Sequence, residues 1–205
     1  MRRRLPLFLF LLFLVPRAWG YVEFSAEFNY DKQVYGPDRN SSLVQRVYSG
    51  SIASYLFAQT ALELNFSIRE EITTDNNNIA VDGTSTSISG YQNNVENTVY
   101  GIGIRQALAG RGAFIRPMIS LGYAKQFVRS YTDYRFTDNN TGQTVTVTDD
   151  IQKSRTDSVF ATFVLQFRLT KHLAIRGSIN TVFPAFDYDL AKDNLKYMLG
   201  MTWIF

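Results

Sequence analysis

The sequence predicts an all-β protein, an eight-stranded antiparallel transmembrane β-barrel of up-and-down topology, behind an N-terminal signal peptide that is removed. Three observations predict this fold. Apolar and polar residues alternate in eight segments of the chain, which is the pattern of half-buried strands. The connections between these segments are alternately short and long, as in bacterial outer-membrane barrels. No segment after residue 20 reads as a membrane-spanning helix.

The first element is a leader over residues 1–20. Residues 2–4 are arginines, residues 5–15 form an apolar run, and the small residues Ala18 and Gly20 mark a cleavage site. This arrangement is typical of a secretory signal peptide. The alternative, an N-terminal membrane anchor, needs an apolar run of ~18 residues. We therefore expect an exported protein that loses its leader.

The leader also explains the basic character of the chain. The sequence has 21 basic and 18 acidic residues, a formal charge of +3 and a pI near 9.1. Four arginines and no acidic residues lie in the leader, which leaves 17 basic and 18 acidic residues and a net charge of −1. No basic patch then argues for a nucleic-acid partner. The absence of cysteine excludes disulfides, thiolate metal sites and a cysteine nucleophile.

Residues 21–205 form the predicted barrel. In its first strand, Val22 and Phe24 alternate with Glu23. The second strand lies within residues 43–57, where two sets of apolar residues compete for one face and leave the register ambiguous. A period of two residues places one face of each strand toward lipid and the other toward the interior. The other six alternating segments are residues 62–68, 97–108, 115–127, 158–168, 173–183 and 195–205.

The connections between the strands differ in length from one side of the barrel to the other. Short periplasmic turns and long extracellular loops are typical of outer-membrane barrels. We therefore expect both ends of residues 21–205 on the periplasmic side. Tight turns are predicted near residues 58–60, 109–112 and 170–172, and long extracellular loops near residues 36–42, 73–94, 129–155 and 184–194.

The third long loop has structure of its own. A glycine-containing turn at residues 139–142 lies between β-prone runs, which predicts a hairpin within residues 131–148. We expect the flanking strands to continue past the membrane as a protruding ribbon. Its strand edges and aromatic residues offer a surface to a partner, and the candidate partner of the loops is an extracellular protein or surface ligand.

Alternation alone leaves two kinds of barrel open. A lipocalin-like soluble carrier turns its apolar face toward a ligand, whereas a membrane barrel turns it toward lipid. The apolar faces here are too bulky and aromatic to fill the lumen of eight strands. The opposite faces hold small and polar residues that can interdigitate, and aromatic residues recur at strand ends as in membrane-interface girdles. These features favour the membrane barrel.

The C-terminal run of residues 197–205, YMLGMTWIF, resembles the last strand of outer-membrane barrels, which ends in an aromatic residue. Gly200, Trp203 and Phe205 match that pattern. Residues 21–205 as a whole resemble the small eight-stranded barrels, namely the OmpA membrane domain, OmpX-like proteins and opacity-type proteins. The resemblance implies an outer-membrane location, contact with outer-membrane lipid and recognition of the last strand by the barrel-assembly machinery.

Three acidic residues and four arginines share the predicted interior face, at similar depth except for Glu27, which lies slightly deeper. A buried charge is costly unless it is paired, so we expect an ion-pair network across the lumen. We favour a structural plug over a gated pore or proton path, since eight strands leave no continuous water-filled channel. The predicted network consists of Glu23, Glu27, Glu63, Arg105, Arg116, Arg168 and Arg176.

The sequence offers poor candidates for chemistry, and we predict no catalytic residue, no cofactor and no metal. His172 is the only histidine and falls in a predicted periplasmic turn, whereas outer-membrane lipid-modifying enzymes need a histidine near the outer side of the membrane. Asp187, Asp189 and Asp193 are spaced as Ca²⁺ ligands could be, but no glycine or terminal glutamate completes a known loop. They are better interpreted as solvated loop acids.

These observations predict a non-enzymatic outer-membrane protein with a structural or adhesive role through its extracellular loops. The alternatives are an outer-membrane lipid-modifying enzyme and a narrow pore for small solutes.

Overall fold

A computed structural model of the chain describes residues 20–36, 38–185 and 194–205. Within these residues no helix is long and apolar enough to cross a membrane. Nearly all of the predicted leader lies outside the described residues. The strands are β1 (Val22–Tyr35), β2 (Ser41–Tyr55), β3 (Thr60–Asp75), β4 (Ile79–Ala80), β5 (Thr86–Ala107), β6 (Ile115–Asp138), β7 (Thr144–Thr148), β8 (Gln152–Arg168), β9 (Leu173–Pro184) and β10 (Lys196–Ile204).

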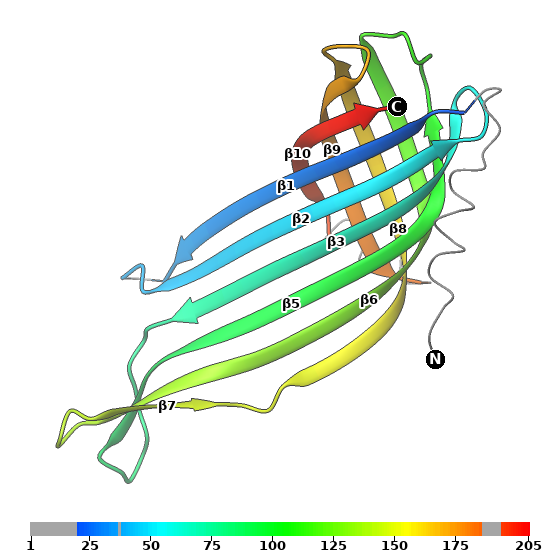
Figure 1. The fold of residues 1–205 in the computed structure, drawn as a ribbon. Helices are drawn as coiled ribbons and strands as arrows, with labels where there is room; N and C mark the ends of the chain where they lie inside the picture. Colours follow the sequence, from blue (N-terminus) through cyan, green and yellow to red (C-terminus); the bar gives the residue numbers. More distant parts are fainter. Residues whose placement is uncertain (1–19, 37, 186–193) are drawn as a thin grey trace.

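Eight of these ten strands close into a ring of antiparallel neighbours (Figure 1). The ring runs β1, β2, β3, β5, β6, β8, β9 and β10, and β10 pairs back onto β1. At this closure Glu23 lies opposite Ile204 and Phe28 lies opposite Leu199. β4 and β7 are short additions to β5 and β6. The predicted eight-stranded antiparallel barrel is therefore confirmed.

The two faces of the ring have opposite chemistry. On β1, Glu23 is fully buried inside the ring, whereas the neighbouring Phe24 is 42% exposed on its outer surface. On β10, Thr202 is buried and Trp203 is exposed. Soluble proteins place acidic and large apolar side chains the other way round. The outward face is thus built for contact with hydrocarbon, as in transmembrane barrels.

The structure also settles the register of the second strand. Tyr55 at the end of β2 is fully buried inside the ring, and Leu56 directly after it is 55% exposed on the outside. The outward row on β2 therefore runs through Tyr48 and Ile52, and the inward row through Ala53 and Tyr55.

Strand pairing runs far into two segments that the sequence predicts as loops. β3 and β5 stay paired as far as Asp75 opposite Tyr91, and β6 and β8 as far as Ser130 opposite Gln152. The loops expected near residues 73–94 and 129–155 are therefore mostly strand. Alternation of hydrophobicity is weak just beyond the barrel, as in residues 92–94 and 129–130, because neither face of the strand contacts lipid there. Backbone pairing does not need an apolar face, so the ladder continues.

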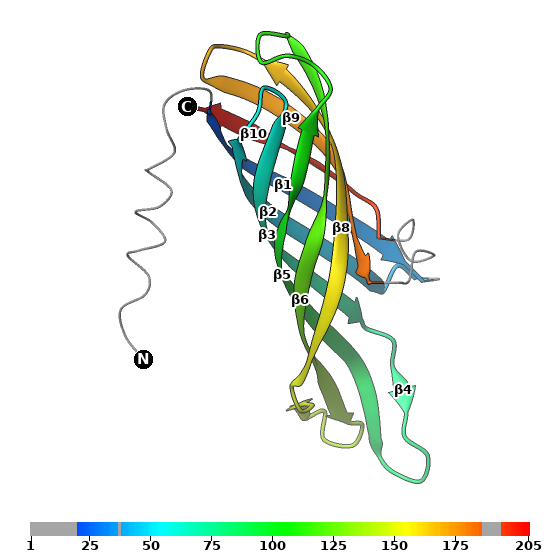
Figure 2. The same ribbon diagram turned by 90° about the vertical axis from the view of Figure 1, so that its right-hand side faces the viewer.

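The ends of β5 and β6 project beyond the other strands and carry β4 and β7 (Figure 2). The hairpin predicted at residues 139–142 is found, with Thr137 opposite Thr144 and the Gly142 N–H donating to the Asp138 carbonyl at 2.7 Å. We call the four-stranded sheet formed by β4, residues 86–92 of β5, residues 133–138 of β6, and β7 the outer sheet.

Candidate functional site

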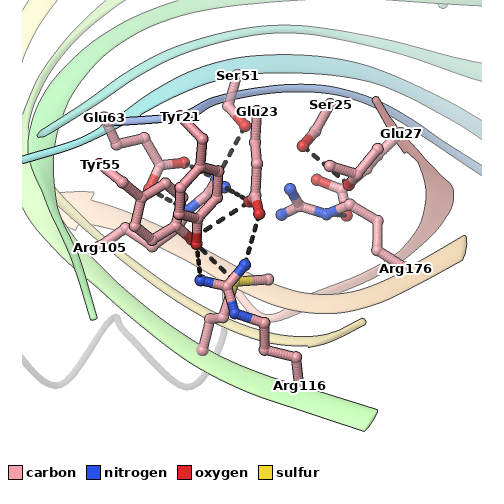
Figure 3. Close-up of polar contacts among 12 residues, drawn as sticks. Tyr21, Glu23, Ser25, Glu27, Ser51, Tyr55, Glu63, Arg105, Arg116 and Arg176 are labelled. Atoms are coloured by element: carbon pink, nitrogen blue, oxygen red, sulfur yellow. Dashed lines mark hydrogen bonds and ion pairs between the residues drawn. The ribbon is translucent and has the colours of Figure 1, made fainter. Parts of the chain in front are cut away.

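Ion pairs fill the interior of the barrel near the end that carries the short turns (Figure 3). Arg105 on β5 meets Glu63 on β3 through two parallel hydrogen bonds, Nε to Oε2 at 3.1 Å and Nη2 to Oε1 at 2.6 Å. This fork-to-carboxylate geometry is the strong form of the arginine–carboxylate pair. Arg105 also donates to the Ser51 hydroxyl at 3.0 Å and lies 3.5 Å from Glu23.

Glu23 links this pair to a second arginine. Arg116 on β6 donates from Nη1 to Glu23 Oε1 at 2.5 Å and also hydrogen-bonds the Tyr21 hydroxyl. The Tyr55 hydroxyl donates to the other oxygen of Glu23 at 3.2 Å. Tyr21 and Tyr55 stack with ring centroids 4.1 Å apart, and the Arg116 guanidinium lies 4.8 Å from the Tyr55 ring centre. Charge and aromatic surface thus share one packed layer across the lumen.

A third pair lies on the adjoining wall. Arg176 on β9 approaches Glu27 on β1 with Nε and Oε1 3.1 Å apart. Gly200 on β10 lies between them in the ladder, opposite both residues. A Cβ on Gly200 would come within 2.0 Å of the Ala26 carbonyl oxygen and 2.7 Å of Glu27 Cγ. Glycine at this position therefore lets Glu27 reach Arg176 across β10.

The structure brings six of the seven predicted interior residues together and places the seventh apart. Arg168 ends β8 at the rim, where it donates to the Thr170 carbonyl at 3.0 Å and the Arg111 carbonyl at 2.7 Å. Its inclusion in the ion-pair network is therefore wrong. The backbone carbonyls of two turns satisfy this arginine, and three carboxylates then meet three arginines without net charge.

Sequence reasoning missed three members of the cluster, namely Tyr21, Ser51 and Tyr55. Tyr21 is two residues before Glu23 and lies on the same inward face. The alternation of the sequence could therefore have predicted that Tyr21 points inward. Ser51 and Tyr55 lie on β2, whose register the alternation left open. Only pairing with β1, in which Glu23 lies opposite Ala53, fixes that register.

A second interior cluster was also missed. Phe160 on β8 points inward, is 2% exposed and packs with Val99 and Ala124. Three glycines on the neighbouring strands β6 and β5 make room for its ring, since a Cβ on any of them would lie within 3.1 Å of a Phe160 ring atom. These glycines are Gly101, Gly103 and Gly122.

The outer sheet presents a continuous apolar face. One row across its four strands joins Ile79, Ile88, Phe136 and Val145. The next row joins Tyr91, Tyr134 and Val147. The ring centroid of Tyr134 lies 6.4 Å from that of Tyr91 and 6.4 Å from that of Phe136. We call these seven residues the outer apolar face; Ile79, Val145 and Val147 are 57%, 61% and 50% exposed.

A β-bulge keeps the outer apolar face continuous. The register of β5 against β6 shifts between Ile88 and Gly90, which inserts Ser89 as an extra residue. Without it, Ile88 and Tyr91 would point to opposite sides of the strand. Gly90 has a φ of 151°, and a Cβ there would lie 2.7 Å from the Asp75 carbonyl oxygen.

The opposite face of the outer sheet is polar. The Thr137 hydroxyl donates to the Ser89 hydroxyl at 2.9 Å and lies 3.1 Å from that of Thr144. At the tip of the sheet the Asn140 N–H donates to the Asp138 carboxylate at 2.8 Å, which holds the pKa of Asp138 below its ordinary value. The outer sheet is therefore amphipathic although both of its faces lie beyond the barrel.

The remaining candidates from the sequence are His172 and three aspartates of the last loop. His172 lies in an exposed turn, with Nδ1 2.9 Å from the Ile204 carbonyl oxygen. Asp187, Asp189 and Asp193 lie outside the described residues. Among the residues that the structure describes, no three histidine or acidic side chains gather as metal ligands would.

The residues of the predicted assembly signal lie on both faces of β10 and at its end. Gly200 points inward, while Trp203 and Phe205 are 41% and 68% exposed on the outer surface. The Phe205 ring meets the Phe24 ring edge to face, with centroids 5.7 Å apart. The terminal aromatic residue thus packs on the strand that closes the ring.

A closed antiparallel ring of eight strands, apolar outside and polar inside, defines the class of small outer-membrane β-barrels. No family model and no curated protein matches the sequence. Solved structures do match. The N-terminal β-barrel domain of Pseudomonas aeruginosa OprF aligns at a TM-score of 0.51 and 14% identity, over 90% of this chain and 97% of that domain. This likeness shows the fold.

Two further solved structures align over similar lengths. Yersinia pestis Ail, the attachment invasion locus protein, in complex with the heparin analogue sucrose octasulfate, has a TM-score of 0.47 and 13% identity over 91% of this chain and 99% of that chain. Pseudomonas aeruginosa OprG has a TM-score of 0.47 and 12% identity over 92% of this chain and 96% of that chain.

Proposed function

We propose that the protein is an exported, non-enzymatic outer-membrane barrel that binds an extracellular protein through the outer apolar face. Residues 1–20 direct export and are removed. The last strand, with Gly200, Trp203 and Phe205, directs insertion by the barrel-assembly machinery. The apolar outer wall of the ring is in contact with outer-membrane lipid.

The outer apolar face is the observation that carries this proposal. Seven apolar side chains on one face of a projecting sheet lie beyond the apolar wall of the barrel, where lipid does not cover them. Exposed apolar patches of this kind mark protein-interaction sites. A protein partner fits best, because a flat apolar sheet face packs against another sheet, and the free edge of β7 can accept a further strand.

The lumen is proposed to be closed rather than conducting. Three neutralised ion pairs and the Tyr21–Tyr55 stack support closure at one level, and Phe160 supports it at another. The narrow-pore alternative predicts conductance steps in planar bilayers. The enzyme alternative lacks support, because His172 has no acidic or serine partner among its described contacts.

Adhesion of vesicles that contain the purified protein to a cultured cell monolayer tests the proposed function. Ile79, Val145 and Val147 are changed together to Thr, which preserves the strand while removing apolar surface. A matched variant on the polar face carries Thr144→Ser and Thr146→Ser. We expect adhesion to fall in the first variant and to persist in the second. Adhesion no stronger than that of protein-free vesicles would contradict the proposal.

A further inference from the structure

The outward surface of β6 and β8 changes from apolar to mainly charged toward the outer sheet, with Phe127 as an apolar exception. Outward residues are apolar from Ile115 to Tyr123 on β6 and from Val159 to Phe167 on β8. Each stretch spans nine residues, and a tilted strand crosses a bilayer in about 9 to 11 residues. The next outward positions toward the outer sheet therefore lie at the level of lipid headgroups.

Four basic residues gather at this level on two neighbouring strands. Pairing of β6 with β8 puts Phe127 opposite Arg155 and Arg129 opposite Lys153. Residues opposite each other have Cβ atoms ~5 Å apart, and outward residues along one strand repeat every ~7 Å. We call this group the headgroup site; it consists of Lys125, Arg129, Lys153 and Arg155.

The headgroup site has spare positive charge. Lys125 lies 3.8 Å from Asp157, and the Arg155 guanidinium lies 5.7 Å from the Phe127 ring centre. Arg129, Lys153 and Arg155 are exposed, and none of them has an ion pair with an acidic residue in the described part of the chain. Their side chains can extend along the strand surface toward a ligand bound below.

The headgroup site borders an acidic sector of the outward surface, where Glu96 on β5 lies opposite Arg129. In the same outward ladder, Glu70 on β3 and Glu96 on β5 lie opposite each other, and Arg46 on β2 lies 3.9 Å from Glu70. A hollow of about 330 Å³ that borders Glu70, Glu96 and Arg129 marks where the acidic sector meets the basic one. A ring of basic residues around the whole barrel would give a lipid no preferred position. The basic cluster on β6 and β8 next to an acidic sector does define one.

We propose that the headgroup site binds the phosphate groups of a lipid in the outer leaflet, with the acyl chains of that lipid on the apolar surface below. Charge complementarity and continuity with the apolar wall both support a phosphorylated lipid as the occupant. The inference rests on the proposed membrane location and adds a fixed lipid contact on the β6–β8 side.

Titration of the detergent-solubilised full barrel, followed by native mass spectrometry, tests the site. The probes are lipid A, which carries two phosphates, the same lipid after removal of its phosphates, and inorganic phosphate. The test variant carries Arg129→Gln, Lys153→Gln and Arg155→Gln. A control with equal loss of charge carries Lys32→Gln, Arg46→Gln and Lys171→Gln, away from β6 and β8.

We expect the unchanged protein to bind lipid A at least about tenfold more tightly than its phosphate-free form. The test variant should lose that preference, and the control should retain it. Equal binding of both lipids, an equal loss in the control, or full competition by millimolar inorganic phosphate would each overturn the proposal. The lipid comparison in the unchanged protein stands even if a variant fails to fold, and a barrel that never enters detergent micelles would refute the membrane location instead.

Discussion

Glu63 and Arg105 show what a charge inside a narrow barrel requires. Both side chains are buried, and every polar atom that Arg105 presents to the lumen contacts Glu63, Glu23 or Ser51. Desolvation of each ion is expensive, and only close, hydrogen-bonded partners offset it. The pair is therefore a structural requirement of the lumen whether or not it stabilises the barrel more than an apolar pair would.

Replacement of Glu63 by Ala should leave Arg105 short of a carboxylate and destabilise the barrel by about 3 kcal/mol. Urea unfolding of the refolded protein in detergent measures this loss. Glu70→Ala is the matched control, because Glu70 belongs to an ion pair with Arg46 whose side chains are about half exposed, and such pairs contribute about 0–1 kcal/mol. Conductance in Glu63→Ala with unchanged stability would contradict the proposed plug.

The sequence identified the interior acids and arginines because period-two alternation assigns each residue to a face. It could not identify which of them touch. Alternation along its strand assigns Arg168 to the interior face. Arg168 nevertheless lies at the rim, where two turn carbonyls accept its hydrogen bonds. Tyr55 joined the cluster only through the register of β2 against β1. Contacts across a ring depend on the register of all eight strands, which local patterns do not carry.

At the scale of elements, Phe160 adds interior packing between β8 and the strands β5 and β6. Phe160→Ala should remove the ring that fills the space above three glycines and destabilise the barrel by about 3 to 5 kcal/mol. Phe163, three residues further on the same strand, is 43% exposed on the outer face, and Phe163→Ala should cost much less because lipid or detergent fills its place. Equal losses in the two variants, measured by urea unfolding, would refute the interior packing.

The closure of β1, β9 and β10 depends on Gly200. Gly200→Ala should destabilise the refolded barrel by about 1 to 3 kcal/mol, the usual range for overpacking, because its Cβ meets the β1 backbone. Gly177 on β9 is the control: a Cβ there meets only Leu199 Cδ2 at 3.6 Å, so Gly177→Ala should be nearly neutral. Measurement on refolded protein separates this packing effect from any effect on assembly in cells.

Among the strands, the lengths of β5 and β6 were the hardest feature to predict from the sequence. Alternation weakens where the strand leaves the lipid, although hydrogen bonding between the strands continues. The sequence predicts the hairpin around residues 139–142, which is part of the outer sheet. It does not predict the apolar face of that sheet. That face depends on the bulge at Ser89, which brings Ile88 and Tyr91 onto the same face of β5.

At the scale of the whole molecule, the chain inverts the usual distribution of residues. Aromatic and aliphatic side chains coat the outside of the ring, and charged side chains fill its interior. This inversion was predictable from the sequence, because eight alternating segments with bulky apolar faces cannot all turn inward in so narrow a ring. The position of the outer sheet beyond the ring was predictable only in outline.

The fluorescence of Trp203 most directly tests whether the outer wall of the barrel contacts lipid. Once residues 1–20 are removed, Trp203 is the only tryptophan, and it is 41% exposed on the outer face of β10. In vesicles we predict blue-shifted emission that lipids with brominated acyl chains quench strongly and aqueous iodide quenches weakly. Emission typical of water, quenched by iodide and indifferent to the brominated lipids, would contradict the account.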